Sequence, residues 1–183
     1  MQTLTRTITN PLIKDEVTFL KTSAETRGAY TLVEVKLAPG GGVPLHYHNS
    51  YRETFACVAG ELSIQCQKDV VRLQSGQSAV AEANTLHRFF NQSPEPCRFL
   101  CRIEPGNPGF EQLLQINYGL ARDGKTNAKG MPKGLLNLAY VLSLGETRLP
   151  GLLSVLGAFF KILARRAVKK GIAAQLQQQY VRF

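Results

Sequence analysis

Residues 40–60 read GGGVPLHYHNSYRETFACVAG and contain two of the three histidines in the chain. We expect a β-strand over residues 43–48. Because successive side chains of a strand point to opposite faces, His46 and His48 would lie on the same face. Glu53 follows His48 by five residues, beyond a turn-like segment that lets the chain reverse. The stretch therefore predicts two imidazoles and one carboxylate close together.

The composition is that of a globular protein, with 183 residues of which 44% are hydrophobic and 19% charged. The length suits one compact domain with an appendage. The formal charge of +9 is unevenly distributed, because residues 1–120 hold 11 basic and 11 acidic side chains, whereas residues 121–183 hold 11 basic and 2 acidic ones. Nucleic acid is not expected as a partner, because no aromatic residues alternate with the basic ones in this tail.

Between residues 17 and 104, short runs rich in β-branched and aromatic residues alternate with Gly, Pro and Asn, which is typical of an all-β fold. Gly60-Glu61 between two such runs predicts a two-residue hairpin with a type II′ turn. About eight short strands at this spacing predict a closed barrel or a sandwich. We expect the strands at residues 31–37, 43–48, 53–59, 62–67, 70–73, 77–81, 86–91 and 97–104.

After Pro105 the apolar period lengthens toward 3.6 residues. Asn107-Pro108 predicts an N-cap and the first turn of a helix that ends near Leu120. Two more helices are expected at residues 135–144 and 151–170. Apolar and basic side chains separate on the last helix. Its apolar face holds Leu153, Leu156, Phe160, Leu163, Ala164 and Ala167, and its other face Lys161, Arg165, Arg166 and Lys169.

The chain is therefore predicted to have two parts. Residues 1–105 form the β-barrel, and residues 106–183 form a basic helical extension that packs on the barrel or on a partner. Residues 175–179 are polar and predict a frayed end. The N-terminus has no apolar core of a secretory signal, which predicts a cytoplasmic protein with free cysteine thiols. The apolar stretch at residues 149–160 is too short and too interrupted to span a bilayer.

His87 begins a further expected strand, so all three histidines can share one site with Glu53. Three neutral imidazoles and one carboxylate give a mixed nitrogen and oxygen donor set, which suits Fe, Mn, Co, Ni, Cu or Zn and is poor for Ca or Mg. An isolated His-x-His in a strand is also common without a metal, so the pair alone leaves that interpretation open.

The spacing resembles the first signature motif of the cupin superfamily, with five residues after Gly40, then His46-Tyr47-His48, four residues, Glu53, six residues and Gly60. The second motif is matched at Gly76, His87 and Asn91, whereas Glu82 and Asn84 stand where that motif has Pro and Gly. Asn tolerates a left-handed backbone and can serve the same turn as Gly.

The resemblance covers roughly residues 28–104 and implies a small single-domain cupin, a double-stranded β-helix or jelly-roll barrel with C-terminal helices. It also implies a homodimer. Carried over residue by residue, it implies that one divalent transition metal (Fe, Mn, Ni, Cu or Zn) is bound by His46, His48, Glu53 and His87.

Residues two positions from these ligands also face the interior of a regular barrel. We therefore predict that the substrate pocket is formed by Phe55, Cys57, Phe89 and Asn91. This mostly apolar lining suits a hydrophobic or aromatic substrate better than a phosphorylated sugar. The alternative is that these side chains are ordinary core residues.

The expected function is that of a metal-dependent enzyme, an oxidoreductase of the dioxygenase type that acts on a small, mostly apolar molecule. An isomerase would use the metal as a Lewis acid instead. The first alternative is a small-ligand-binding cupin without turnover. The second is a scaffold or membrane-surface protein that acts through its basic C-terminal helix.

Overall fold

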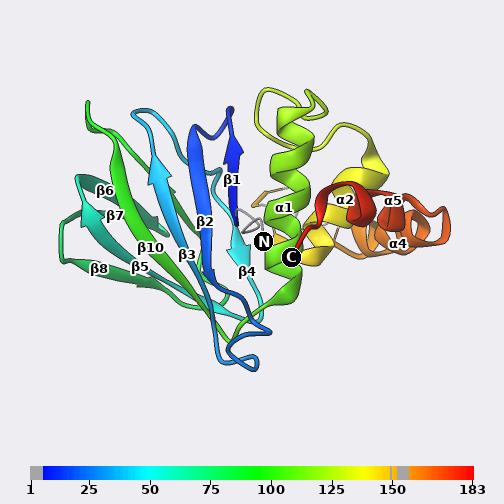
Figure 1. The fold of residues 1–183 in the computed structure, drawn as a ribbon, viewed down its shortest axis with the longest axis horizontal. Coiled ribbons are helices and arrows are strands. Elements are labelled where there is room, and N and C mark those ends of the chain that lie inside the picture. Colours follow the sequence, from blue (N-terminus) through cyan, green and yellow to red (C-terminus); the bar gives the residue numbers. More distant parts are fainter. Residues whose placement is uncertain (1–5, 149, 152–156) are drawn as a thin grey trace, which may run out of the picture.

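The computed structural model describes residues 6–148, 150–151 and 157–183. Figure 1 shows β-strands at one end of the molecule and helices at the other. The strands are β1 (Thr7–Asn10), β2 (Asp15–Lys21), β3 (Thr31–Leu37), β4 (Tyr47–His48), β5 (Arg52–Ala59), β6 (Glu61–Cys66), β7 (Asp69–Gln74), β8 (Ser78–Ala81), β9 (His87–Phe90), β10 (Cys97–Glu104) and β11 (Thr147–Arg148). The helices are α1 (Pro108–Arg122), α2 (Leu135–Leu144), α4 (Gly157–Lys169) and α5 (Ile172–Tyr180).

The described strands form three sheets, in the orders β1-β2-β3-β10-β5-β8, β7-β6-β9 and β11-β4. Side chains of β3 and β10 alternate between buried and more exposed positions, so that Val33, Val35 and Phe99 enter the main core. The all-β fold with C-terminal helices is therefore confirmed. Instead of one closed hydrogen-bonded barrel, the described strands form separate sheets, linked by isolated bridges at Gly42–Phe90 and His46–His87.

The predicted hairpin at Gly60 is wrong, because β5 and β6 belong to different sheets. Gly60 has a φ of +75°, and a β-carbon there would lie 2.8 Å from the carbonyl oxygen of Pro96. Only glycine allows this turn and close approach without strain. The turn carries the chain from one sheet to the other, a long-range feature that a local turn signal does not encode.

The strand expected over residues 43–48 is also shorter than predicted, since β4 contains only Tyr47 and His48. Pro44 has no N–H to donate to a ladder, and the residues before β4 make isolated backbone bonds and bridges instead. Among these, Val43 N donates to the carbonyl of Phe89 and His46 N to that of His87.

Helix α1 begins as predicted, with Asn107 as its N-cap and Pro108 in its first turn. The Asn107 side chain accepts a hydrogen bond from Phe110 N at 2.9 Å. The buried carboxylate of Glu111 fastens the helix to the strands, because its Oε1 accepts from Ser23 N at 2.5 Å and from the Thr31 hydroxyl at 2.6 Å. The predicted helix over residues 135–144 is confirmed as α2.

Of the helix predicted over residues 151–170, the structure describes α4 from Gly157 to Lys169, and Gly151 lies in a turn with a φ of +78°. Leu153 and Leu156 lie outside the described residues. The predicted apolar face is buried at Leu163, Ala164 and Ala167, whereas the four basic residues named for the opposite face are exposed. No helix among the described residues is long and apolar enough to cross a membrane.

The frayed end predicted at residues 175–179 is wrong, because these residues lie within α5. Leu176 and Tyr180 are buried on its inner face, and the Tyr180 hydroxyl donates to Asp123 at 2.6 Å. The second core cluster, which joins α1, α2, α4 and α5, therefore holds the polar C-terminal segment.

Candidate metal centre

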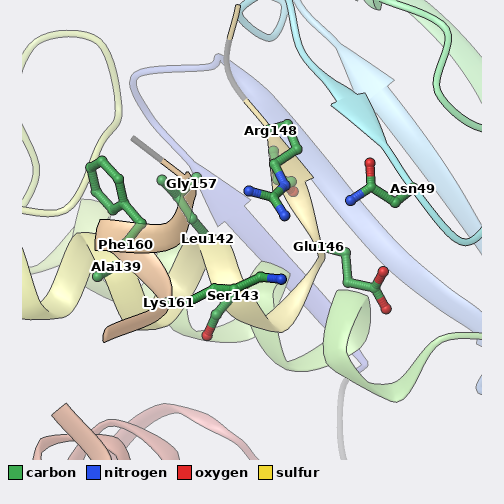
Figure 2. A pocket seen from close by; sticks show the side chains of 10 residues that line it. Asn49, Ala139, Leu142, Ser143, Glu146, Arg148, Gly157, Phe160 and Lys161 are labelled. Carbon is green, nitrogen blue, oxygen red and sulfur yellow. The ribbon is translucent and has the colours of Figure 1, made fainter. Parts of the chain in front are cut away.

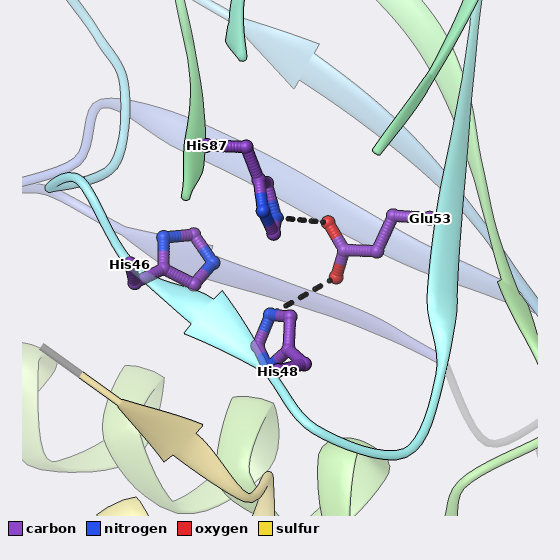
Figure 3. A group of neighbouring side chains, drawn as sticks. All are labelled: His46, His48, Glu53 and His87. Atoms are coloured by element: carbon purple, nitrogen blue, oxygen red, sulfur yellow. Dashed lines mark hydrogen bonds and ion pairs between the residues drawn. The ribbon is translucent and has the colours of Figure 1, made fainter. Parts of the chain in front are cut away.

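Three strands bring the predicted site residues together (Figure 3). His46 lies just before β4 and His48 within it, Glu53 is at the start of β5, and His87 is at the start of β9. One ligand atom from each residue lies within 4.8 Å of those of the others. We call these four residues the histidine cluster. Paired backbone bonds between His46 and His87, of 3.0 and 2.7 Å, set the two chain segments side by side.

Backbone carbonyls orient two of the imidazoles. His46 Nδ1 lies 2.8 Å from the carbonyl oxygen of Pro44, and His87 Nδ1 lies 2.8 Å from that of Thr85. A carbonyl oxygen only accepts, so each Nδ1 carries a proton and each Nε2 is the nitrogen that faces the cluster. This is the arrangement that metal-binding histidines use.

His48 is held by a tyrosine and by the C-terminal part of the chain. Its Nδ1 lies 2.6 Å from the Tyr51 hydroxyl and 3.2 Å from the carbonyl of Gly145. The Tyr51 hydroxyl donates to the same carbonyl at 2.8 Å, and the two rings stack with centroids 4.3 Å apart. Strand β11 then pairs with β4, with Thr147 opposite His48. The helical extension therefore reaches the cluster directly.

The second cupin motif has Gly where this chain has Asn84, and the structure shows the backbone conformation of that residue. This residue adopts a left-handed backbone with a φ of +65°, as the sequence comparison of Asn with Gly predicted. Asn84 N donates to the carbonyl of His48 at 2.7 Å. The turn before His87 therefore also anchors the strand that contains His48.

One buried lone pair at the centre has no hydrogen-bond partner among the residues that the structure describes. His48 Nε2 is shielded from solvent and makes no hydrogen bond, although it lies 3.5 Å from Glu53 Oε1. His87 Nε2 lies 3.3 Å from Glu53 Oε2. An unpaired buried polar atom costs free energy, which a bound cation would remove. The donor atoms present therefore fit a transition metal with mixed nitrogen and oxygen ligands.

The electrostatics favour the ligand forms of three of these four side chains. Burial raises the pKa of Glu53, but the hydrogen bond from His87 and the nearby histidine charges outweigh burial and lower that pKa to about 2. Burial and the neighbouring histidines lower the pKa of His46 to about 3, and burial lowers the pKa of His48. For His87, burial lowers the pKa, but the hydrogen bond and charge of Glu53 outweigh it and raise the pKa. A metal would have to displace the His87 proton.

A cavity of about 180 Å³ adjoins the cluster, and we call it the cluster cavity. His46, His48 and Glu53 form part of its wall. Of the four residues predicted to form the substrate pocket, Phe89 lines this cavity. The structure places the other three elsewhere: Phe55 and Cys57 are buried in the main core, and Asn91 is buried in a turn where its side chain bonds to Leu37, Ser93 and Glu95.

A second pocket, of about 290 Å³, lies beside β11, and we call it the outer pocket (Figure 2). Glu146, Arg148 and Lys161 give it a charged lining, and it contains none of the four cluster residues. It shares Leu142 and Thr147 with the cluster cavity. A metal held by the histidine cluster would therefore face the cluster cavity and not the outer pocket.

Two features of the site escaped the sequence analysis. Tyr51 is buried, and its hydroxyl holds His48. Its position three residues after His48, in the turn toward Glu53, was the available signal. The contribution of Gly145 had no sequence signal, because 97 residues separate it from His48. The four cysteines are free, and burial raises the pKa of Cys57 and Cys101, so neither is an activated thiolate.

Residues 33–103 match the sequence model of the cupin domain family, a segment that includes the whole histidine cluster. A search of curated proteins found no match. Among solved structures, the chain is similar to KdgF from Halomonas sp., at 18% identity over 53% of this chain and 84% of that one, with a TM-score of 0.48. It is also similar to a predicted oxalate decarboxylase from Thermotoga maritima, at 24% identity over 50% of this chain and 80% of that one, with a TM-score of 0.47.

Proposed function

Because residues 33–103 form a cupin domain, we propose that this protein is a metal-dependent enzyme of the oxygenase type that acts on a small, mostly apolar molecule. One divalent transition metal would be held by His46, His48, Glu53 and His87. The observation that supports this most directly is the buried, unpartnered Nε2 of His48, which faces a carboxylate and two further imidazoles. When bound, such a metal supplies redox chemistry or, if redox-inert, Lewis acidity.

The chain itself would provide orientation and a dry binding site. Pro44 and Thr85 carbonyls fix two imidazole rings, and Tyr51 with Gly145 fixes the third. Glu53 stays ionised at neutral pH. The apolar walls of the cluster cavity exclude water from the substrate and favour a hydrophobic molecule over a charged one. Such a site can bind a substrate next to the metal without a dedicated anion-binding residue.

Elemental analysis of the purified protein tests the proposal. We expect close to one transition-metal ion per chain in the wild type, and a loss of most of that metal in Glu53→Ala and in His87→Ala. Glu82→Ala is the matched control, because Glu82 is an exposed carboxylate outside the cluster. Wild type that stays empty after reconstitution with Fe, Mn, Ni, Cu and Zn, or variants that keep full metal content, would contradict the assignment.

Two alternatives have their own support. The same cavity would serve a ligand-binding protein without turnover, and a metal-loaded protein that binds ligands but consumes neither oxygen nor substrate would favour it. The outward face of α4 exposes Ile162 beside Arg165 and Lys169, which supports a role at an anionic membrane surface. Sedimentation with anionic vesicles tests that role. The division at residue 105, the homodimer and the cytoplasmic location stay predictions.

A further inference from the structure

The cluster cavity has two walls of different origin. Strand residues Val33, Val35 and Phe89 form one side, and helix residues Leu113 and Val141 form part of the other. The helical extension therefore completes the binding space beside the histidine cluster. Because both walls are apolar, any polar side chain among the lining residues decides which hydrogen-bonding group a ligand can bring.

The size of the cavity limits the ligand. A cavity of about 150 Å³ lined by aliphatic and aromatic residues is large enough to bind benzene. The cluster cavity measures about 180 Å³. It therefore has room for one substituted six-membered ring or a branched chain of similar size.

Asn117, on α1, lines this cavity without a hydrogen-bond partner. Its Oδ1 is shielded from solvent and unpaired, and its amide makes no hydrogen bond to any residue that the structure describes. The neighbouring Tyr118 also lines the cavity, but its hydroxyl is already donated to Asp15 at 2.5 Å. Lys129 is exposed. A primary amide can both donate and accept, so a ligand in the cavity offers the partner that Asn117 lacks.

We propose that Asn117 is a specificity-determining residue that selects a monocyclic, otherwise apolar molecule with one hydroxyl or similar hydrogen-bonding group. The proposal deepens the proposed function, because it rests on substrate binding in the cavity beside the metal cluster. The hydrogen bond to Asn117 satisfies the partly buried side-chain amide, whereas an apolar analogue of the same size leaves it unpaired. The helical extension therefore selects the ligand as well as completing the cavity.

The test compares p-cresol with toluene, which differ by one hydroxyl on the same ring. Their dissociation constants are measured by NMR titration of metal-free and metal-loaded protein, for the wild type and for Asn117→Leu. We expect the ratio of the two constants to shift toward toluene in Asn117→Leu, on the order of tenfold, which is the effect of one buried hydrogen bond. Asn137→Leu, on α2, is the matched control, because Asn137 does not line the cavity.

Toluene binding by Asn117→Leu at near wild-type affinity shows that the cavity has stayed intact. An unchanged cresol-to-toluene ratio in that variant, or failure of both molecules to bind the wild type, overturns the proposal. An equal shift in Asn137→Leu overturns it as well. The measurement on metal-free protein separates a failure of this proposal from a failure of the proposed function. The ratio of the two dissociation constants does not require a metal, and the metal content found by elemental analysis does not depend on Asn117.

Discussion

At the scale of single residues, the site depends on a few hydrogen bonds that fix the direction of each imidazole. The Nε2 atoms converge because every Nδ1 has an acceptor nearby. The His-x-His period and the spacing to Glu53 are local features that predicted three members of the histidine cluster, and the resemblance to the cupin motifs implied the fourth, His87. Sequence alone did not predict the acceptors, because backbone carbonyls have no sequence signature and Gly145 approaches only through tertiary folding.

Tyr51→Phe should weaken metal binding while the protein stays folded. The substitution removes the hydroxyl 2.6 Å from His48 Nδ1, and loss of such an outer partner typically costs 10- to 100-fold in metal affinity. We expect an effect of about tenfold, the lower end of that range, because Gly145 O remains 3.2 Å from the same nitrogen. Competition with a chromophoric chelator measures it. Tyr47→Phe is the control, and equal affinities for Tyr51→Phe and wild type would show that Tyr51 does not position His48.

Asp15 should make the protein less stable as the pH rises. Burial raises its pKa from 3.8 to about 7, although the hydrogen bond from Tyr118 opposes the shift. The folded state therefore binds a proton more tightly than the unfolded state, so this contribution is complete below pH 4 and is lost as the pH rises through 7.

Asp15→Asn keeps an acceptor for the Tyr118 hydroxyl but cannot ionise. Compared with wild type, the variant should gain free energy of unfolding between pH 4 and pH 8, by a few kcal/mol at most. Urea denaturation at several pH values, on metal-free protein, measures the difference. Glu16→Gln controls for a carboxylate on the same strand that is not buried. Parallel pH profiles for wild type and Asp15→Asn would mean that Asp15 stays ionised when buried.

At the scale of elements, regular periodicity was predictable and sheet partnership was not. The bounds of β3, β10 and α2 followed from alternation or a 3.6-residue period. The sequence at Gly60 predicted a hairpin because a Gly-containing two-residue turn looks the same whether the two flanking strands pair with each other or enter different sheets. Here β5 pairs with β10 and β8, while β6 pairs with β7 and β9.

Helix α5 illustrates the opposite error. Its glutamines made the segment look solvent-exposed, but three of its residues are spaced so that they meet the other helices: Ala173, Leu176 and Tyr180. The hydroxyl of Tyr180 adds bonds to Asp123 and Lys125 beyond the end of α1. Tertiary packing therefore stabilises a segment whose local composition gives little help.

At the scale of the whole molecule, the helical extension and the strands share one site. Strand β11 pairs with β4, and the Gly145 carbonyl accepts bonds from His48 and Tyr51. Helices α1 and α2 complete the wall of the cluster cavity. The tail was predicted to pack on the barrel or on a partner. The described contacts support packing within the chain and go further, because the tail supplies part of the site.

This shared construction predicts that metal binding stabilises the C-terminal segment as well as the strands. A ligand that binds only the folded state at 100 times its dissociation constant adds about 2.7 kcal/mol of stability. If Zn²⁺ fixes His48, then Tyr51 and Gly145 are fixed with it, so amide hydrogen exchange at residues 145–148 should slow together with exchange in β4. Exchange in α5, which is remote from the cluster, should change least.

Hydrogen-exchange mass spectrometry with and without Zn²⁺ measures this coupling, and Glu53→Gln serves as the control because it lacks the carboxylate ligand. In Glu53→Gln the slowing at both segments should largely disappear. If Zn²⁺ slows exchange only in the strands and leaves residues 145–148 unchanged, the hydrogen bonds through Gly145 do not couple the extension to the metal site. The helices would then be a covering for the cavity whose stability is independent of the metal.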